Sequence, residues 1–338
     1  MDEEGSGPAA QRLNNHAKWL HNRRRQVSTC NATRENRVKI GLNFMGAERL
    51  FGGDFAGVLD LIARVDKAGV DLISTCDHLG FDGAVHAERV RTHGFPYPVE
   101  QPWLEPLSFL SAAAAVSKRA RLSVFVLVAP LRPALLLAKQ LATLDVISNG
   151  RVTMCLGVGW QKAEYEASNM PFEGRFAYLE EMISACRILW SQAPASFAGE
   201  RIRFDDFHSM PHPVQRERLP VLLGFAPTDR NFERIARVGD GWAVNPVDLP
   251  TFAERVAALR RIVAAHGRDP EMLEIEVQFA PVRHANGAID LEATSDSAAQ
   301  WAAAGATTLT PLLISWCQAA GEVDGLLEWS LRLKERLA

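Results

Sequence analysis

The chain has 338 residues, of which 47% are hydrophobic, and this length suits one large barrel or two smaller domains. Its formal net charge of −3 and the lack of a long apolar run argue against nucleic-acid and membrane partners. The five cysteines are scattered without a CxxC pair, which argues against a disulfide framework or a zinc site and favours reduced thiols in a cytoplasmic protein.

The first 37 residues are polar and carry a basic run from Arg23 to Arg25. They show no core-forming periodicity and no apolar segment of the kind found in a secretory signal. We therefore expect residues 1–37 to form a disordered tail that the fold does not need. A basic arm that touches a partner is the less favoured alternative.

From Val38 onward, strand-like and helix-like segments alternate. The expected strands cover residues 38–44, 70–75, 121–128, 151–156, 219–224, 241–245, 273–280 and 306–313. Apolar strands separated by amphipathic helices predict a parallel sheet covered by helices. Eight such units in roughly 300 residues predict a single (β/α)8 TIM barrel over residues 38–338. An open doubly wound sheet is the alternative, but residues 43–46 do not form the GxGxxG turn expected there.

Two segments interrupt the alternation. Residues 195–218, after the fourth strand, look like a hairpin (195–198 and 201–204) followed by a proline-rich loop, and we expect them to lie outside the barrel sheet. Residues 79–104 are polar, contain prolines and are expected to form a long loop. Their aromatic side chains are expected to shape a substrate pocket.

The active site of a TIM barrel lies where the strands end, at the C-terminal face. The residues expected to line that face are Asn43, Phe44, Asp77, His78, Val126, Gly157 to Trp160, Gly224, Trp242, Asn245, Gln278 and Thr310. Of these, Asn43, Phe44, Trp242 and Asn245 are expected to line the substrate pocket.

An ordered run of short motifs resembles a known family. The motifs are Asp77-His78, residues 133–145, 148–151, 157–160, 171–173, 213–215 and 239–242. Over about residues 38–265 they resemble the luciferase-like monooxygenases, and within these the branch that uses the deazaflavin coenzyme F420. The resemblance implies a luciferase-like barrel that holds a deazaflavin or flavin over its mouth.

The resemblance gives His78 a catalytic role. A histidine at a strand end can exchange a proton with a substrate or a cofactor near neutral pH. Asp77 would orient the imidazole or cap the following turn. Taken alone, the dipeptide favours a capping aspartate and a loop histidine with no catalytic role; its position in the barrel and the resemblance favour the catalytic role instead.

The stretch Gly157-Val158-Gly159-Trp160 is expected to bind the cofactor. Glycines after a strand let backbone N–H groups approach a phosphate, and the helix start that follows favours an anion. Trp160 would stack against the ring system. The alternative is an ordinary turn with a core tryptophan.

Two further segments of the expected cofactor site depart from the family. In the turn after the fifth strand, Gly224 and Thr228 are retained as phosphate-binding candidates, although Phe225 departs from the pattern and Asp229 would repel phosphate. In the third strand, Phe125-Val126 stands where the family usually has a small residue before the valine. The family often has a cis peptide at that bond.

Other chemistries find little support in the residues. The pair Glu164/Glu166 lies on an expected helix with the pattern of a solvated face. His208 and His212 are four residues apart, but the neighbouring prolines disfavour the helical face that a metal site would use. We therefore expect no metal site.

The leading hypothesis is an oxidoreductase that transfers a hydride between coenzyme F420 and a small organic substrate. A two-component monooxygenase that uses FMN and oxygen is the alternative within the enzymes. A barrel that has lost catalysis and only binds a ligand is the competing class, favoured by Phe125 and Phe225. The family resemblance and the Ala-rich segments 108–116 and 135–144 also predict a homodimer.

Overall fold

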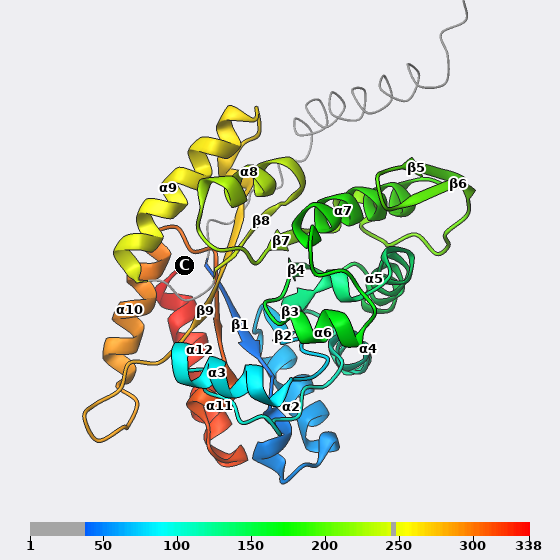
Figure 1. Cartoon of the computed structure of the whole chain (residues 1–338). Coiled ribbons are helices and arrows are strands. Elements are labelled where there is room, and N and C mark those ends of the chain that lie inside the picture. Colours follow the sequence, from blue (N-terminus) through cyan, green and yellow to red (C-terminus); the bar gives the residue numbers. More distant parts are fainter. Residues whose placement is uncertain (1–37, 245–247) are drawn as a thin grey trace, which may run out of the picture. The chain divides into compact units, whose positions relative to one another are not determined.

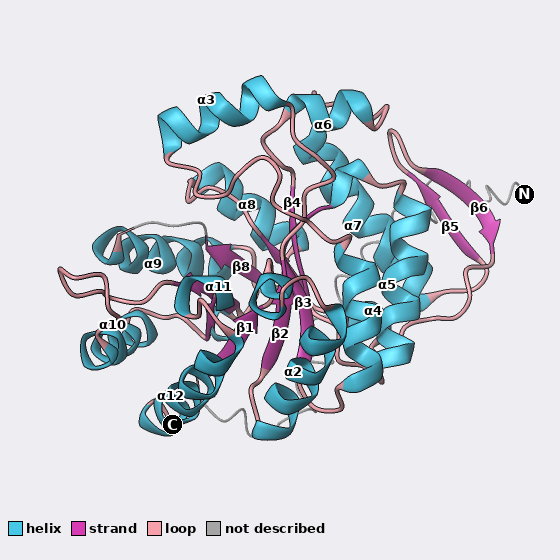
Figure 2. Ribbon diagram, turned by 90° about the horizontal axis from the view of Figure 1, so that it is seen from below, coloured by secondary structure: helices cyan, strands magenta, loops and turns pink. Residues whose placement is uncertain are grey.

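The computed structural model describes residues 38–244 and 248–338, so the expected tail and Asn245 lie outside the described residues. Eight parallel strands form a closed barrel ringed by helices (Figures 1 and 2). In order around the barrel they are β1 (Lys39–Asn43), β2 (Leu72–Thr75), β3 (Arg121–Val128), β4 (Met154–Gly157), β7 (Val221–Leu223), β8 (Gly241–Val244), β9 (Glu274–Phe279) and β10 (Thr308–Pro311). Since β10 pairs in parallel with β1, the ring is complete and the (β/α)8 prediction is confirmed.

Amphipathic helices cover the outside of the barrel. The principal ones are α2 (Phe55–Ala68), α4 (Pro106–Val116), α5 (Ala134–Ser148), α6 (Lys162–Ala167), α7 (Arg175–Ser191), α8 (Asp229–Val238), α9 (Leu249–Ala265), α10 (Leu291–Ala303) and α12 (Val323–Arg336). Shorter turns are η1 (Ala47–Phe51), η2 (Ala129–Leu131), η3 (Arg216–Arg218), η4 (Pro270–Met272), α11 (Leu313–Trp316) and η5 (Ala320–Glu322). In α2 the buried side chains of Val58, Leu61, Ile62 and Val65 follow the spacing of one helix face. Among the described helices, none has the length and apolarity that a bilayer crossing requires.

The hairpin of β5 (Ala195–Ala198) and β6 (Arg203–Phe207) forms a separate two-stranded antiparallel sheet, as the sequence predicts. It lies beyond the end of α7 (Figure 1). The carboxylate of Glu181 on α7 accepts hydrogen bonds from the backbone N–H groups of Arg201 and Ile202, at 2.9 and 2.8 Å. These bonds attach the insertion to the helix layer.

Residues 79–104 contain a helix that the sequence analysis missed, α3 (Gly83–His93). Asp82 caps its first turn by accepting from the N–H of Val85 at 2.9 Å, and Gly94 ends it with a φ of 61°. Only His86 of this helix is buried, so α3 has no apolar stripe that sequence periodicity could reveal.

The barrel interior is partly polar. An apolar group of Phe125, Cys155, Leu222 and Ala243 fills one side of it. Beside this group, Cys155 Sγ lies 3.2 Å from a carboxylate oxygen of Glu276, and the hydroxyl of Thr310 donates to the other oxygen at 3.0 Å. Burial raises the pKa of Glu276 to about 6.

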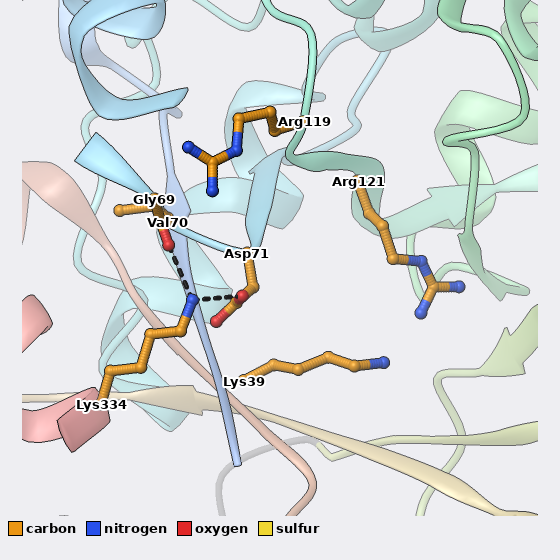
Figure 3. Close-up of a pocket in the computed structure, with 7 residues that line it drawn as sticks. All are labelled: Lys39, Gly69, Val70, Asp71, Arg119, Arg121 and Lys334. Carbon is orange, nitrogen blue, oxygen red and sulfur yellow. Dashed lines mark hydrogen bonds and ion pairs between the residues drawn. The ribbon is translucent and has the colours of Figure 1, made fainter. Parts of the chain in front are cut away.

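A hollow of about 260 Å³ opens where the strands begin, opposite the mouth (Figure 3). Its lining residues are Lys39, Gly69, Val70, Asp71, Arg119, Arg121 and Lys334. The ammonium group of Lys334 donates to the carbonyl of Gly69 and to the carboxylate of Asp71. These bonds connect α12 to the start of β2, at the N-terminal face of the barrel, where contacts in TIM barrels serve stability. We therefore place the candidate site at the C-terminal face.

Candidate functional site

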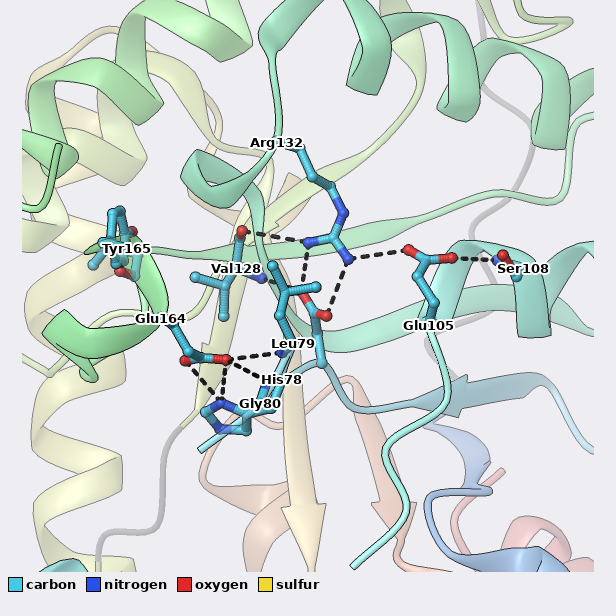
Figure 4. Close-up of polar contacts among 11 residues, drawn as sticks. His78, Leu79, Gly80, Glu105, Ser108, Val128, Arg132, Glu164 and Tyr165 are labelled. Carbon is cyan, nitrogen blue, oxygen red and sulfur yellow. Dashed lines mark hydrogen bonds and ion pairs between the residues drawn. The ribbon is translucent and has the colours of Figure 1, made fainter. Parts of the chain in front are cut away.

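His78 and Glu164 form a buried pair at the mouth of the barrel (Figure 4). His78 follows β2, and its Nδ1 lies 3.1 Å from both carboxylate oxygens of Glu164 on α6. The side chains are only 10% and 3% exposed. The same carboxylate accepts from the backbone N–H groups of Leu79 at 2.8 Å and Gly80 at 3.4 Å. The prediction that Glu164 lies on a solvated face is therefore wrong.

The environment of Glu164 keeps it ionised. Burial alone would raise its pKa, but the hydrogen bond and charge of His78 and the N–H of Leu79 outweigh burial and lower the pKa below its usual range. A carboxylate bonded to Nδ1 fixes the orientation of the imidazole and leaves Nε2 as the ring nitrogen for a ligand. The pair can therefore present a positioned proton donor or acceptor.

Asp77 does not orient His78, so that prediction is wrong. Its carboxylate pairs with the guanidinium of Arg132 at 2.7 and 3.0 Å and accepts from the N–H of Val128 at 2.9 Å. Arg132 in turn bonds to Glu105 at 3.0 Å. Asp77 and His78 follow the end of β2 and bind different partners, Arg132 and Val128 in one case and Glu164 in the other. Asp77 joins the ends of β2 and β3 instead.

Aromatic rings surround the imidazole of His78. The ring centroids of Phe81, Trp103, Trp160 and Phe95 lie 4.6, 5.0, 5.8 and 6.5 Å from that of His78. Three of these rings come from residues 79–104, the segment expected to shape the substrate pocket. Because they displace water from the imidazole, hydrogen bonds and charges there act in a low dielectric.

Gln161 fastens the start of this segment to the end of β4. Its amide donates to the carbonyl of Gly80 at 2.8 Å, and its carbonyl oxygen accepts from the N–H of Asp82 at 2.9 Å. Gln161 is fully buried. Together with Glu164 it holds the residues that follow His78 in one conformation.

Val126 forms a platform at the mouth with two glycines. The Phe125-Val126 peptide is cis, and the register of β3 shifts there. A Cβ on Gly157 would lie 2.9 Å from a methyl group of Val126, and one on Gly224 would lie 2.4 Å from the other. Only glycine therefore fits beside Val126, and the ends of β4 and β7 carry no side chain there. Phe125 packs inside the barrel and is 8% exposed, so it does not cover the platform.

The turn after β4 is shaped by packing. Gly159 has a φ of 61°, and a Cβ on it would lie 2.7 Å from a methyl group of Val128. Val158 is buried, and its carbonyl accepts from the hydroxyl of Tyr165 at 2.6 Å. These contacts explain the glycine without a ligand, so the phosphate-binding role of residues 157–160 stays a prediction.

Phe225, in the turn after β7, leaves the mouth free. It is 1% exposed and packs on Phe176 of α7, with 5.3 Å between ring centroids. Thr228 caps α8 with its hydroxyl, and the carboxylate of Asp229 pairs with Arg255. Since that ion pair offsets the negative charge, the repulsion of a phosphate expected from Asp229 is reduced.

Two members of the predicted substrate pocket point away from the barrel axis, so their assignment is wrong. Trp242 is fully buried between Phe232 and Phe252, whose ring centroids lie at 5.2 and 6.1 Å. Phe44 is buried and lies 6.4 Å from Phe109 of α4. Both belong to the layer between strands and helices.

Asn43, the residue before Phe44, lies beside the end of β2. Its side-chain amide approaches Cys76 Sγ at 3.5 Å, and its oxygen accepts from the N–H of Met45 at 3.0 Å. It is fully buried. Asn43 therefore supports the strand ends, and its contact with a substrate stays a prediction.

Comparison with known proteins gives a consistent result. A family model described as luciferase-like monooxygenase matches residues 51–315. An uncharacterized protein of Mycobacterium tuberculosis is 37% identical over 206 residues, which cover 60% of this chain and 67% of that protein. The pyrimidine monooxygenase RutA of Pantoea ananatis is 29% identical over 204 residues, 59% and 56% of the two chains. The FMNH2-dependent dimethylsulfone monooxygenase of Pseudomonas putida is 30% identical over 166 residues, 48% and 45%.

Solved structures share the fold at lower identity. The coenzyme F420-dependent tetrahydromethanopterin reductase of Methanopyrus kandleri superposes with a TM-score of 0.69 at 14% identity, over 89% of this chain and 100% of that one. The riboflavin lyase RcaE, solved with modified FMN and riboflavin, gives 0.71 at 15% identity, over 89% and 92%. These two matches show the fold, and the family model covers most of the barrel, from residue 51 to residue 315. The chain therefore belongs to the luciferase-like monooxygenase family.

Proposed function

We propose that this protein is an oxidoreductase that transfers a hydride between coenzyme F420 and a small organic substrate. The observation that carries the proposal is the His78–Glu164 pair, which lies at the barrel mouth inside a ring of aromatic side chains. Hydride transfer to a carbonyl carbon needs a proton for the carbonyl oxygen, and hydride transfer from an alcohol carbon needs the hydroxyl proton to be removed; this pair can supply or accept that proton.

The residues at the mouth fit a planar cofactor. Gly157 and Gly224 add no side chain beside Val126, and Trp160, whose ring contacts His78, follows Gly157 by three residues. The helix start at Thr228 would favour the cofactor phosphate. When bound, the reduced deazaflavin supplies a hydride and the oxidised form accepts one.

The protein's own contribution is proton handling in a site that excludes water. Nε2 of His78 would donate a proton to the substrate oxygen during reduction and accept it during oxidation. Glu164 acts through His78: its charge holds Nδ1 and stabilises the imidazolium. Proton transfer by a positioned side chain typically contributes a factor of about 10²–10⁴ in rate.

Reduced FMN with oxygen is the second candidate. The Pseudomonas putida relative is named FMNH2-dependent, and its identity exceeds that of the F420-dependent structural match. The mouth residues described above would serve either ring system. Oxygen consumption with reduced FMN, measured against oxidation of reduced F420 by a panel of small aldehydes and ketones without oxygen, separates the two.

The test of the catalytic role uses His78→Ala and His78→Gln. We expect turnover to fall by about 100-fold or more, because a proton-transfer contact made in the transition state is lost. The cofactor dissociation constant should stay within about twofold of the parent's, since binding does not depend on that contact. His93→Ala, at the exposed end of α3, is the control. Turnover of His78→Ala equal to the parent's would remove His78 from the mechanism.

We further propose that two copies pair through the outer face of α5. This face exposes Leu135, Leu136, Val146 and Ile147, each between 42 and 51%. The pairs 135/146 and 136/147 are eleven residues apart, which is about three helical turns, so they form one stripe. Met210 and Val214 extend the apolar surface beside α5. A symmetric dimer would bring two such stripes together.

A further inference from the structure

Arg89 has no ionic partner among the described residues. It lies on α3, which is beside α6 in the fold (Figure 2). Its guanidinium carbon lies 4.9 Å from the centroid of the Trp160 ring. Its Nε is buried and has no hydrogen-bond partner. A half-buried cation is thus held against a ring that also contacts His78.

The carboxylates of the two helices are already engaged. Asp82 caps α3, Glu88 pairs with Arg91, Glu164 binds His78, and Glu166 pairs with Lys162. None of these bonds includes Arg89. The negative charge that would neutralise this guanidinium therefore does not come from α3 or α6.

A second donor around the imidazole also lacks an acceptor. Trp103 lies 5.0 Å from the ring of His78, and its buried Nε1–H donates no hydrogen bond. The unsatisfied atoms of Trp103 and Arg89 are both N–H donors, and the rings of Trp103 and Trp160 beside them both contact His78. Because a buried donor without an acceptor is unfavourable, a ligand that brings acceptors gains affinity there.

We propose that Arg89 binds an oxyanion, a carboxylate or a phosphate, carried by the molecule that occupies the barrel mouth. The ligand would then combine a flat apolar body, which suits the aromatic walls, with a negative charge beside Trp160. The guanidinium offers two parallel N–H donors to such a group. Its contact with the Trp160 ring restrains the side chain before binding, so less side-chain entropy is lost. This inference rests on the proposed function only for the location of the ligand.

The oxyanion has two possible sources, the cofactor and the substrate, and paired probes separate them. FMN is compared with riboflavin, which lacks the phosphate, and benzoate is compared with the neutral isostere benzamide. Dissociation constants are measured by calorimetry for the full chain, for Arg89→Met and for Arg89→Lys. The matched control is Arg91→Met, because Arg91 is exposed, lies two residues after Arg89 on α3 and pairs with Glu88.

We expect the parent and Arg91→Met to prefer the anionic member of at least one pair. Arg89→Met should lose that preference by about tenfold or more, and Arg89→Lys should keep part of it, because the charge remains without the fork. Loss in the FMN pair would assign the cofactor phosphate to Arg89 in place of the helix start at Thr228, and loss in the benzoate pair assigns the oxyanion to the substrate. Melting temperatures within a few degrees show that the variants are folded.

Two results would overturn the inference: no preference for either anion in the parent, or preferences in Arg89→Met that match the parent's within about twofold. Failure of the proposed function has a different signature. It would appear as unchanged turnover in His78→Ala, whatever the charge preference of Arg89→Met.

Discussion

Replacing Asp77 with Asn should destabilise the fold strongly. The side chain of Asp77 is 0% exposed and that of Arg132 8%, so the substitution breaks a buried ion pair. Removing one partner of such a pair typically costs about 3–5 kcal/mol, because the remaining charge stays buried. Glu105 recovers little of this, since it is 38% exposed. At roughly 2–3 °C per kcal/mol for a domain of this size, the melting temperature should fall by about 6–15 °C.

Urea unfolding of Asp77→Asn, Arg132→Met and the double variant measures the effect. The double variant should lose less than the sum of the single losses, because it leaves neither charge unpaired. Asp60→Asn, an exposed residue on α2, is the control and should stay within about 0.5 kcal/mol of the parent. If Asp77→Asn left the unfolding free energy unchanged and lowered turnover instead, Asp77 would have the catalytic role that its ion pair argues against.

Three further predictions concern the site and the assembly. Because the pKa of Glu164 is lowered in the folded protein, its carboxylate stabilises the fold fully above its ordinary pKa of 4.5, and this stabilisation is lost as the pH falls through the folded-state pKa. The unfolding free energy of Glu164→Gln should therefore differ from the parent's at pH 7 and converge with it near pH 3. An equal difference at both pH values would contradict this. Gly224→Ala should lower the free energy of unfolding in urea by about 1–3 kcal/mol, because the new methyl group clashes with Val126. Adding Val126→Ala should restore most of that free energy. If it restores none, another contact requires the glycine. Ile147→Glu should convert a dimer into a monomer by light scattering while Met272→Glu, equally exposed elsewhere, should not, and a parent that is already monomeric would refute the dimer.

The barrel could be predicted from sequence because its signal is repeated. Each strand is a short apolar run and each covering helix has an apolar stripe, so the eightfold alternation survives errors of a few residues at the boundaries. Helix α3 lacks such a stripe and depends on local caps at Asp82 and Gly94, so its residues resemble a polar loop. The hairpin was found because it interrupts the helical spacing.

The candidate site could be predicted only where position along a strand decides it. His78 follows directly from its place at the end of β2. Glu164 was missed because α6 is a six-residue helix whose burial depends on the chain 86 residues away. The misassignment of Trp242 had a signal in the sequence: strand residues alternate, so the small Ala243 faces the crowded interior and the bulky Trp242 faces the helices.

The most direct test of a flavin-type cofactor at this mouth is a titration of the full chain with F420 and with FMN, in which binding is monitored by the quenching of tryptophan fluorescence. We predict that one of them binds with a dissociation constant of about 10 μM or tighter, corresponding to roughly 7 kcal/mol. We also predict that most of the quenching disappears in Trp160→Phe, because Trp160 follows Gly157 by three residues and contacts His78 at the mouth, while affinity changes little. Absence of binding by both cofactors at about 1 mM, or quenching that is unchanged in Trp160→Phe, would contradict a cofactor seated on Val126 between the ends of β4 and β7.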